Sequence, residues 1–74
     1  MLEKRSFSLS GHRTSVALEP EFWAALEAIA TQRGQMLLAL VTGLDATRAQ
    51  GQPLASALRV FALHHVRPEF PARF

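Results

Sequence analysis

Apolar and polar residues alternate twice near the start of the chain, in the stretch SFSLSGHRTSVAL from Ser6 to Leu18. Successive side chains of a β-strand point to opposite faces, so each alternating half predicts a strand with one apolar and one polar face. One face of the second half is expected to cover a core: Thr14, Val16 and Leu18. The other face is expected to meet solvent or a ligand: Arg13, Ser15 and Ala17.

The first half of this stretch places Phe7 and Leu9 on one face and serines on the other. Between the halves, Gly11 and His12 suit a two-residue type II′ hairpin loop, which has glycine at its first central position. Such a loop would set Phe7 opposite Val16, and every facing pair would then match in character. We favour a hairpin, or at least an ordered first strand. The alternative is that residues 4–10 form a mobile arm.

Three helices are predicted after the strands, over roughly 20–33, 36–49 and 53–66. Pro20 and Pro53 suit the first helical position, and the glutamates beside Pro20 favour a helix N-terminus. Gly34 and Gly51 follow the first two helices as stops. Gly43 weakens the second helix unless close packing needs it. The chain is therefore expected to have a mainly helical α+β fold.

The chain has 74 residues, so it forms one domain at most. We expect this domain to span 1–67, and Pro68 and Pro71 to begin a C-terminal tail over 68–74. A chain this short buries only about 60% of its unfolded surface. Because 49% of its residues are hydrophobic, the composition favours an oligomer in which a partner completes the core.

The net charge of +2 says little about partners, but its distribution along the chain is uneven. The first eighteen residues carry three cations against one carboxylate: Lys4, Arg5 and Arg13 against Glu3. Residues 19–50 carry two arginines against four carboxylates. This layout gives a positively charged edge on a neutral body, which suits an anionic partner and equally suits simple solubility.

Catalytic and metal-binding patterns are absent from the sequence. There is no cysteine, and the adjacent His64 and His65 would point about 100° apart on a helix, which disfavours a shared metal. No nucleophile elbow and no phosphate-cradling glycine loop occurs. We therefore expect no enzyme activity, no metal and no cofactor. Arg59 is a candidate ion-pair partner for Asp45, either buried or exposed.

The longest run without a charged residue, Gly34 to Leu44, has 11 residues, whereas a membrane span needs about 20. The first residues run directly into the alternating segment and do not resemble a signal peptide. We therefore expect a soluble, cytoplasmic protein with no membrane partner.

The order of strand, helix, glycine-containing turn and helix resembles the ribbon-helix-helix domain family of the Arc/MetJ-like superfamily. Three strings carry the resemblance: GHRTSVALEPEFWAAL (Gly11 to Leu26), LDATR (Leu44 to Arg48) and SALRVFAL (Ser56 to Leu63). The similarity is closest to a small bacterial subgroup with an extra C-terminal helix. It implies an intertwined homodimer whose two strands pair antiparallel across a two-fold axis.

The resemblance also implies site residues, since the ribbon of the DNA-binding members enters the major groove. Outward side chains at alternate strand positions would contact bases: Arg13, Ser15 and Ala17. Other residues would contact phosphates, at the start of the second helix and near the strands: Lys4, Arg5, His12, Gln35 and Met36. The dimer core would include Val16, Leu18, Leu26, Leu40, Leu44 and Phe61.

Two functions follow from these expectations. The first is a homodimeric DNA-binding transcriptional regulator, with double-stranded DNA and a second copy of the chain as partners. The alternative is a protein-interaction module on the same fold. It gains weight from Ala17, which has no base-reading group, and from Met36, which stands where a serine or threonine cap is usual. It gains further weight if residues 4–10 pair as a strand, because a four-stranded dimer sheet is wider than the ribbon that the groove admits.

Overall fold

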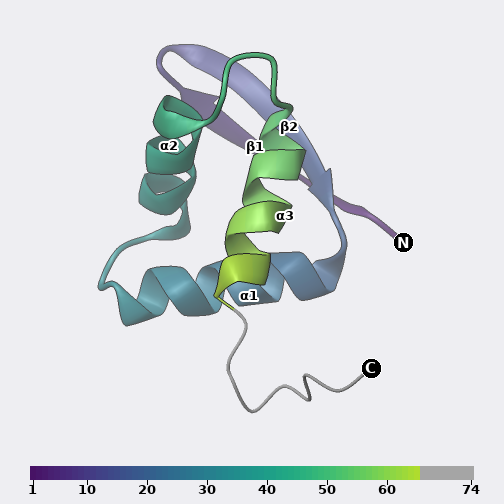
Figure 1. The fold of residues 1–74 in the computed structure, drawn as a ribbon, viewed down its shortest axis with the longest axis vertical. Coiled ribbons are helices and arrows are strands. Elements are labelled where there is room, and N and C mark those ends of the chain that lie inside the picture. The colour runs from purple at the N-terminus through teal and green to yellow at the C-terminus, as the bar shows by residue number, and fades with distance from the viewer. Residues whose placement is uncertain (66–74) are drawn as a thin grey trace.

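Two strands and three helices follow one another in a computed structural model that describes residues 1–65 (Figure 1). Their bounds are β1 Glu3–Leu9, β2 His12–Leu18, α1 Pro20–Gln32, α2 Leu37–Thr47 and α3 Leu54–His64. The mainly helical α+β fold predicted from the sequence is confirmed, and each helix begins and ends within two residues of its predicted limits. The predicted domain limit at 67 and the tail over 68–74 lie outside the described residues.

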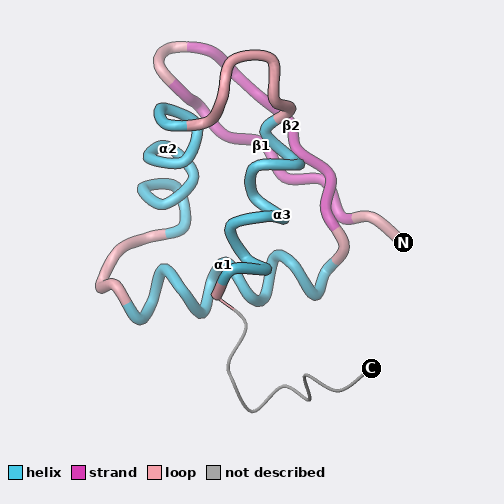
Figure 2. Tube along the Cα trace, in the orientation of Figure 1, coloured by secondary structure: helices cyan, strands magenta, loops and turns pink. Residues whose placement is uncertain are grey.

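The hairpin of β1 and β2 forms one layer and the helices form the other (Figure 2). Helices α2 and α3 stand side by side over the sheet, and α1 crosses below them. Helix α2 contacts β1, α3 contacts β2, and α1 contacts both strands. One face of the sheet is therefore covered by the helices, and the opposite face is left for solvent or a partner.

The predicted hairpin is confirmed, but its register and loop differ from the expectation. Its two loop residues are Ser10 and Gly11, with φ of 51° and 82°, so Leu9 faces His12 and Phe7 faces Thr14. Positive φ at both central residues is the mark of a type I′ turn, whose twist matches that of the strands. The predicted loop at Gly11 and His12 was therefore wrong.

The two registers differ by two residues, so the faces of the strands are the same in both. The observed register pairs β1 with β2 over their full lengths, from Glu3 opposite Leu18 to Leu9 opposite His12. The expected register would have placed Leu18 opposite Arg5 and left Glu3 and Lys4 beyond the end of β2. The observed register therefore has the longer ladder of paired residues and a type I′ turn, and both features favour it over the expected one.

Apolar side chains from all five elements form one core. Its buried members are Phe7, Leu9, Val16, Leu18, Trp23, Leu26, Ile29, Ala30, Leu40, Val41, Leu54, Leu58 and Ala62. The ring centroids of Phe7 and Trp23 lie 5.8 Å apart, which joins the first strand to the first helix. No polar side chain is buried in the part of the chain that the structure describes.

Helix α2 contains Gly43, where a Cβ would meet no atom within 4 Å. Close packing among the described residues therefore does not require glycine at this position. The helix bears the usual cost of an interior glycine, about 1 kcal/mol relative to alanine.

Substitution of Leu58 by alanine is expected to lower the free energy of unfolding by about 2–5 kcal/mol, because the side chain is fully buried in the core. Urea unfolding followed by circular dichroism measures the change. Leu63→Ala on the same helix is the matched control, since this side chain is 63% exposed and should change stability by about 0.5 kcal/mol or less. Equal losses in the two variants would contradict the packing of α3.

Substitution of Ser10 by asparagine is expected to raise the melting temperature, because asparagine tolerates positive φ and Asn-Gly is the preferred type I′ pair. Gly11→Ala should instead lower the free energy of unfolding by about 1–2 kcal/mol, because alanine is strained at φ of 82°. Thermal unfolding measures both. A lower melting temperature for Ser10→Asn would indicate that Ser10 is a strand residue and would favour the loop at Gly11 and His12.

Candidate nucleic-acid interface

Six side chains point away from the helices, and we call their surface the outer sheet face. They are Lys4, Ser6 and Ser8 of β1, and Arg13, Ser15 and Ala17 of β2. All are exposed except Ala17, which is half-buried. Across the strands, Lys4 faces Ala17, Ser8 faces Arg13, and the hydroxyls of Ser6 and Ser15 lie 3.0 Å apart. The three residues expected to contact bases thus lie together on one exposed surface.

Positive charge without a carboxylate partner gathers on the outer sheet face. Within residues 1–65, three arginines form ion pairs with carboxylates: Arg5, Arg48 and Arg59. Lys4 and Arg13 have no such partner among those residues, and both belong to the outer sheet face. Arg33 lies elsewhere, with its guanidinium 5.2 Å from the centre of the Phe61 ring. The ion pairs therefore neutralise the helical side of the domain and leave the sheet side basic.

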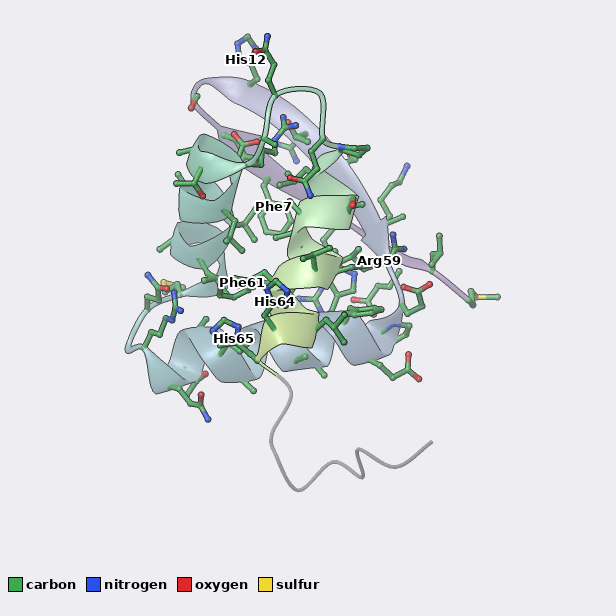
Figure 3. The ribbon with its side chains drawn as sticks, viewed as in Figure 1. Phe7, His12, Arg59, Phe61, His64 and His65 are labelled. Carbon is green, nitrogen blue, oxygen red and sulfur yellow. The ribbon has the colours of Figure 1, made fainter. Side chains whose placement is uncertain are left out.

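His12 follows the hairpin turn and projects from that end of the molecule (Figure 3). Its exposed position beside Arg13 suits the predicted phosphate contact, which stays a prediction. The other two histidines lie at the end of α3, where the Nδ1 atom of His65 is 2.9 Å from the carbonyl oxygen of Phe61. No group of three histidine, aspartate or glutamate side chains suited to a metal occurs among residues 1–65.

Arg5 lies on the helix-facing side of the sheet rather than on the outer sheet face. Its guanidinium lies 4.9 Å from the centre of the Trp23 ring and forms ion pairs with Glu27 and Glu3. Hydrogen bonds to Glu27 and then to Glu3 raise the pKa of Arg5 above its ordinary value. The indole Nε1 of Trp23 donates to the carbonyl oxygen of Glu3 at 2.7 Å.

These contacts join β1 to α1, a role that the sequence interpretation missed. Arg5 and Phe7 are two residues apart on β1, so they lie on the same face of the strand. The alternation of the sequence was therefore enough to predict that Arg5 points inward. The partner Glu27 could not be read from it, because the pairing depends on how α1 crosses the sheet. A phosphate contact by Arg5 stays a prediction, and it would compete with the ion pair to Glu27.

Arg59 forms its ion pair with Glu19, at 3.1 Å, and not with Asp45 as expected. Asp45 pairs instead with Arg48, which lies three residues further along the chain at the end of α2. The expectation was wrong because each group has another partner: Asp45 pairs within three residues of itself, and Arg59 pairs across to the start of α1. The pKa of Glu19 is lowered by a hydrogen bond from its own backbone amide and further by Arg59.

The start of α2 lies beside the end of α1, at the other end of α2 from the hairpin turn (Figure 1). Gly34, at φ of 67°, allows the amides of Gly34 and Gln35 to bond to the carbonyls of Thr31 and Ala30 and so to end α1. Met36 then begins α2 without a side-chain cap. One chain therefore does not bring the predicted phosphate contacts Gln35 and Met36 next to Arg13, and their roles stay predictions.

Met36 and Leu38 are exposed apolar residues at the start of α2, with 80% and 48% of their surface accessible. They border a shallow, mainly apolar hollow together with Gln35, Ala39, Thr42 and Gly43. We call this surface the α2 patch. Its exposed apolar side chains are of the kind found at protein contacts.

The residues predicted for a dimer core are used in the core of the single chain. Four of them are buried there: Val16, Leu18, Leu26 and Leu40. Leu44 and Phe61 are half-buried and pack against this core. Their contribution to a dimer stays a prediction.

A family model described as a ribbon-helix-helix domain matches residues 2–66. Because the match covers most of the chain, the protein belongs to the ribbon-helix-helix domain family. No curated protein and no solved structure matches the chain. Domains of this family are regulatory modules that generally bind DNA as dimers, rather than enzymes. Within residues 1–65, no helix has the length and apolarity to cross a membrane.

Substitution of Glu19 by glutamine is expected to flatten the fall of stability in acid. The pKa of Glu19 is lowered from its ordinary value of 4.5 in the folded chain. The ionised carboxylate therefore stabilises the fold above that value, and this contribution is lost as the pH falls through the lowered pKa. Urea unfolding at neutral pH and at several values below about 4.5 measures the difference. Glu21→Gln is the control, because it removes the same charge from a residue without an ion pair among the described residues. If Glu19→Gln and Glu21→Gln have the same stability at every pH, the role of Glu19 is contradicted.

Proposed function

We propose that this protein binds double-stranded DNA through the outer sheet face and regulates transcription. The observation that carries the proposal is the position of Lys4 and Arg13, which are exposed, lack carboxylate partners among residues 1–65 and share one face of the hairpin. Membership of a family that generally binds DNA supports the same function.

The outer sheet face has the form and the chemistry that major-groove binding requires. A two-stranded ribbon fits a groove about 12 Å wide. Arg13 can grip guanine O6 and N7 with two hydrogen bonds, a contact worth about 1–3 kcal/mol of discrimination. Lys4, near the start of β1, suits a phosphate contact that weakens as salt rises. The small side chains between them allow the sheet to approach the bases closely.

The proposal includes assembly as a homodimer, as is general in the family. The α2 patch is a surface suited to this contact, because its members are uncharged and mostly apolar and two copies can meet there without repulsion. Two chains joined on their helical sides would each keep the outer sheet face free. Such a dimer would present two hairpins to DNA.

The α2 patch also favours a second candidate function, a protein-interaction module that does not bind DNA. The uncapped start of α2 supports this reading, because it lacks the serine or threonine hydroxyl that would help to hold a phosphate. The two functions differ in the surface used, the outer sheet face for DNA and the α2 patch for a protein.

Mixed-sequence duplex DNA is expected to bind at low salt, with an affinity that falls steeply as salt rises. Arg13→Ala should relax sequence preference, whereas Lys4→Ala should weaken all sequences alike and reduce the salt slope by about 1. Fluorescence anisotropy at several salt concentrations measures these effects.

Arg33→Ala is the matched control, since it removes one positive charge from the helical side of the domain. It should change affinity much less than Lys4→Ala does. Absence of binding at low salt would contradict DNA binding and leave the protein-interaction module as the better reading. Equal effects of all three variants would show that net charge, and not the outer sheet face, controls binding.

A further inference from the structure

A complete two-stranded antiparallel ribbon is present within one chain. Strands β1 and β2 pair from Glu3 opposite Leu18 to Leu9 opposite His12, and the loop that joins them has two residues. The inner face of this hairpin covers the chain's own core, and its outer face is exposed. No strand from a second copy is needed to build it.

We propose that the DNA-reading ribbon is this hairpin of a single chain, and that Ser8 of β1 reads a base beside Arg13 of β2. The inference rests on the proposed DNA binding and specifies how the site is read. The two strands differ in sequence, so each hairpin reads an asymmetric stretch of DNA. Residues of β1 thereby become determinants of sequence preference.

The first argument is that β1 is fixed to the body of the domain. Phe7 and Leu9 are buried in the core, so release of β1 would expose two large apolar side chains to water. Trp23 donates to the carbonyl oxygen of Glu3, and Arg5 pairs with Glu27 of α1. A strand held at both ends and along its inner face is not free to leave β2.

The second argument is the width of the major groove. Neighbouring strands lie about 4.8 Å apart. Two strands therefore span about 5 Å between their axes, and four strands span about 14 Å, before side chains are added. The groove is about 12 Å wide, so it admits the hairpin but not a sheet made by joining two hairpins edge to edge.

The third argument is the position of Ser8 on the outer sheet face. Ser8 is exposed and lies directly opposite Arg13, the residue best suited to grip a guanine. Ser6 and Ser15, further along the ladder, have their hydroxyls within hydrogen-bond distance of each other. Of the β1 residues on the outer sheet face, Ser8 is therefore the one nearest to a base contacted by Arg13.

The test compares preferred sequences selected from a random pool of duplex DNA by the wild-type protein, Ser8→Asn and Arg13→Ala. Asparagine can form two hydrogen bonds with adenine, so Ser8→Asn should gain a preference for adenine of about tenfold at one position. That position should neighbour the one at which Arg13→Ala loses preference. Thr31→Asn introduces the same amide at an exposed position of α1 and should leave the preferred sequence unchanged.

Circular dichroism establishes that each variant is folded. If Ser8→Asn weakens the strand, Ser8→Thr replaces it, because threonine suits a strand and its methyl group can contact that of thymine. This variant should then gain a preference for thymine at the same position.

One outcome is that the folded Ser8 variants select the same DNA sequence as the wild type, whereas Arg13→Ala selects a different one. This outcome would overturn the single-chain ribbon and leave DNA binding intact. A preferred sequence with a two-fold axis midway between two closely spaced Arg13-dependent positions would also overturn it, because that symmetry requires β2 of two copies. Failure of every protein, the wild type included, to bind DNA at low salt would overturn the proposed function and this inference together.

Discussion

Burial of one face of the hairpin against the helices is the constraint on which the remaining structure depends. Phe7 and Leu9 of β1 and Val16 and Leu18 of β2 enter the same core as Trp23 of α1. Because side chains alternate along a strand, burial of this set leaves every intervening side chain on the outer sheet face. The exposed serines, Lys4 and Arg13 are therefore displayed as a consequence of how the core is packed.

Pairing of charges on the helical side complements this packing. Arg5 turns inward with the apolar residues of β1, and there it meets the ring of Trp23 and the carboxylate of Glu27. Arg59 similarly meets Glu19 where β2 leads into α1. Both contacts join segments that are distant in the sequence. Each pairs an arginine with a carboxylate, so that neither arginine repels the other basic residues of the domain. The basic character of the outer sheet face thus reflects selective neutralisation elsewhere rather than a high total charge.

The order of elements, their approximate limits and the faces of both strands could be predicted from the sequence, since these depend on local periodicity and on proline and glycine positions. The hairpin register could not, because loops at Ser10-Gly11 and at Gly11-His12 give the same faces. Only the length of the ladder and the twist of the turn distinguish them.

The partners of Arg59 and Arg5 could not be predicted, because each depends on how two helices or a helix and a strand cross in space. Of the candidate site, the grouping of Arg13, Ser15 and Ala17 followed from alternation alone. The inclusion of Ser8 and Lys4 in the same surface required the pairing of β1 with β2. The separation of Gln35 and Met36 from Arg13 likewise required the three-dimensional arrangement of α1 and α2.

Helix α2 combines an uncapped start at Met36 with an interior glycine at Gly43, and only two of its residues, Leu40 and Val41, are buried. Local unfolding is favoured where few apolar contacts oppose it, so amide hydrogens of α2 are expected to exchange with solvent sooner than those of α1. The hairpin is held by α1 and α3 as well as by α2. The domain can therefore loosen around the α2 patch, and adapt its shape to a protein there, while the surface proposed for DNA keeps its form.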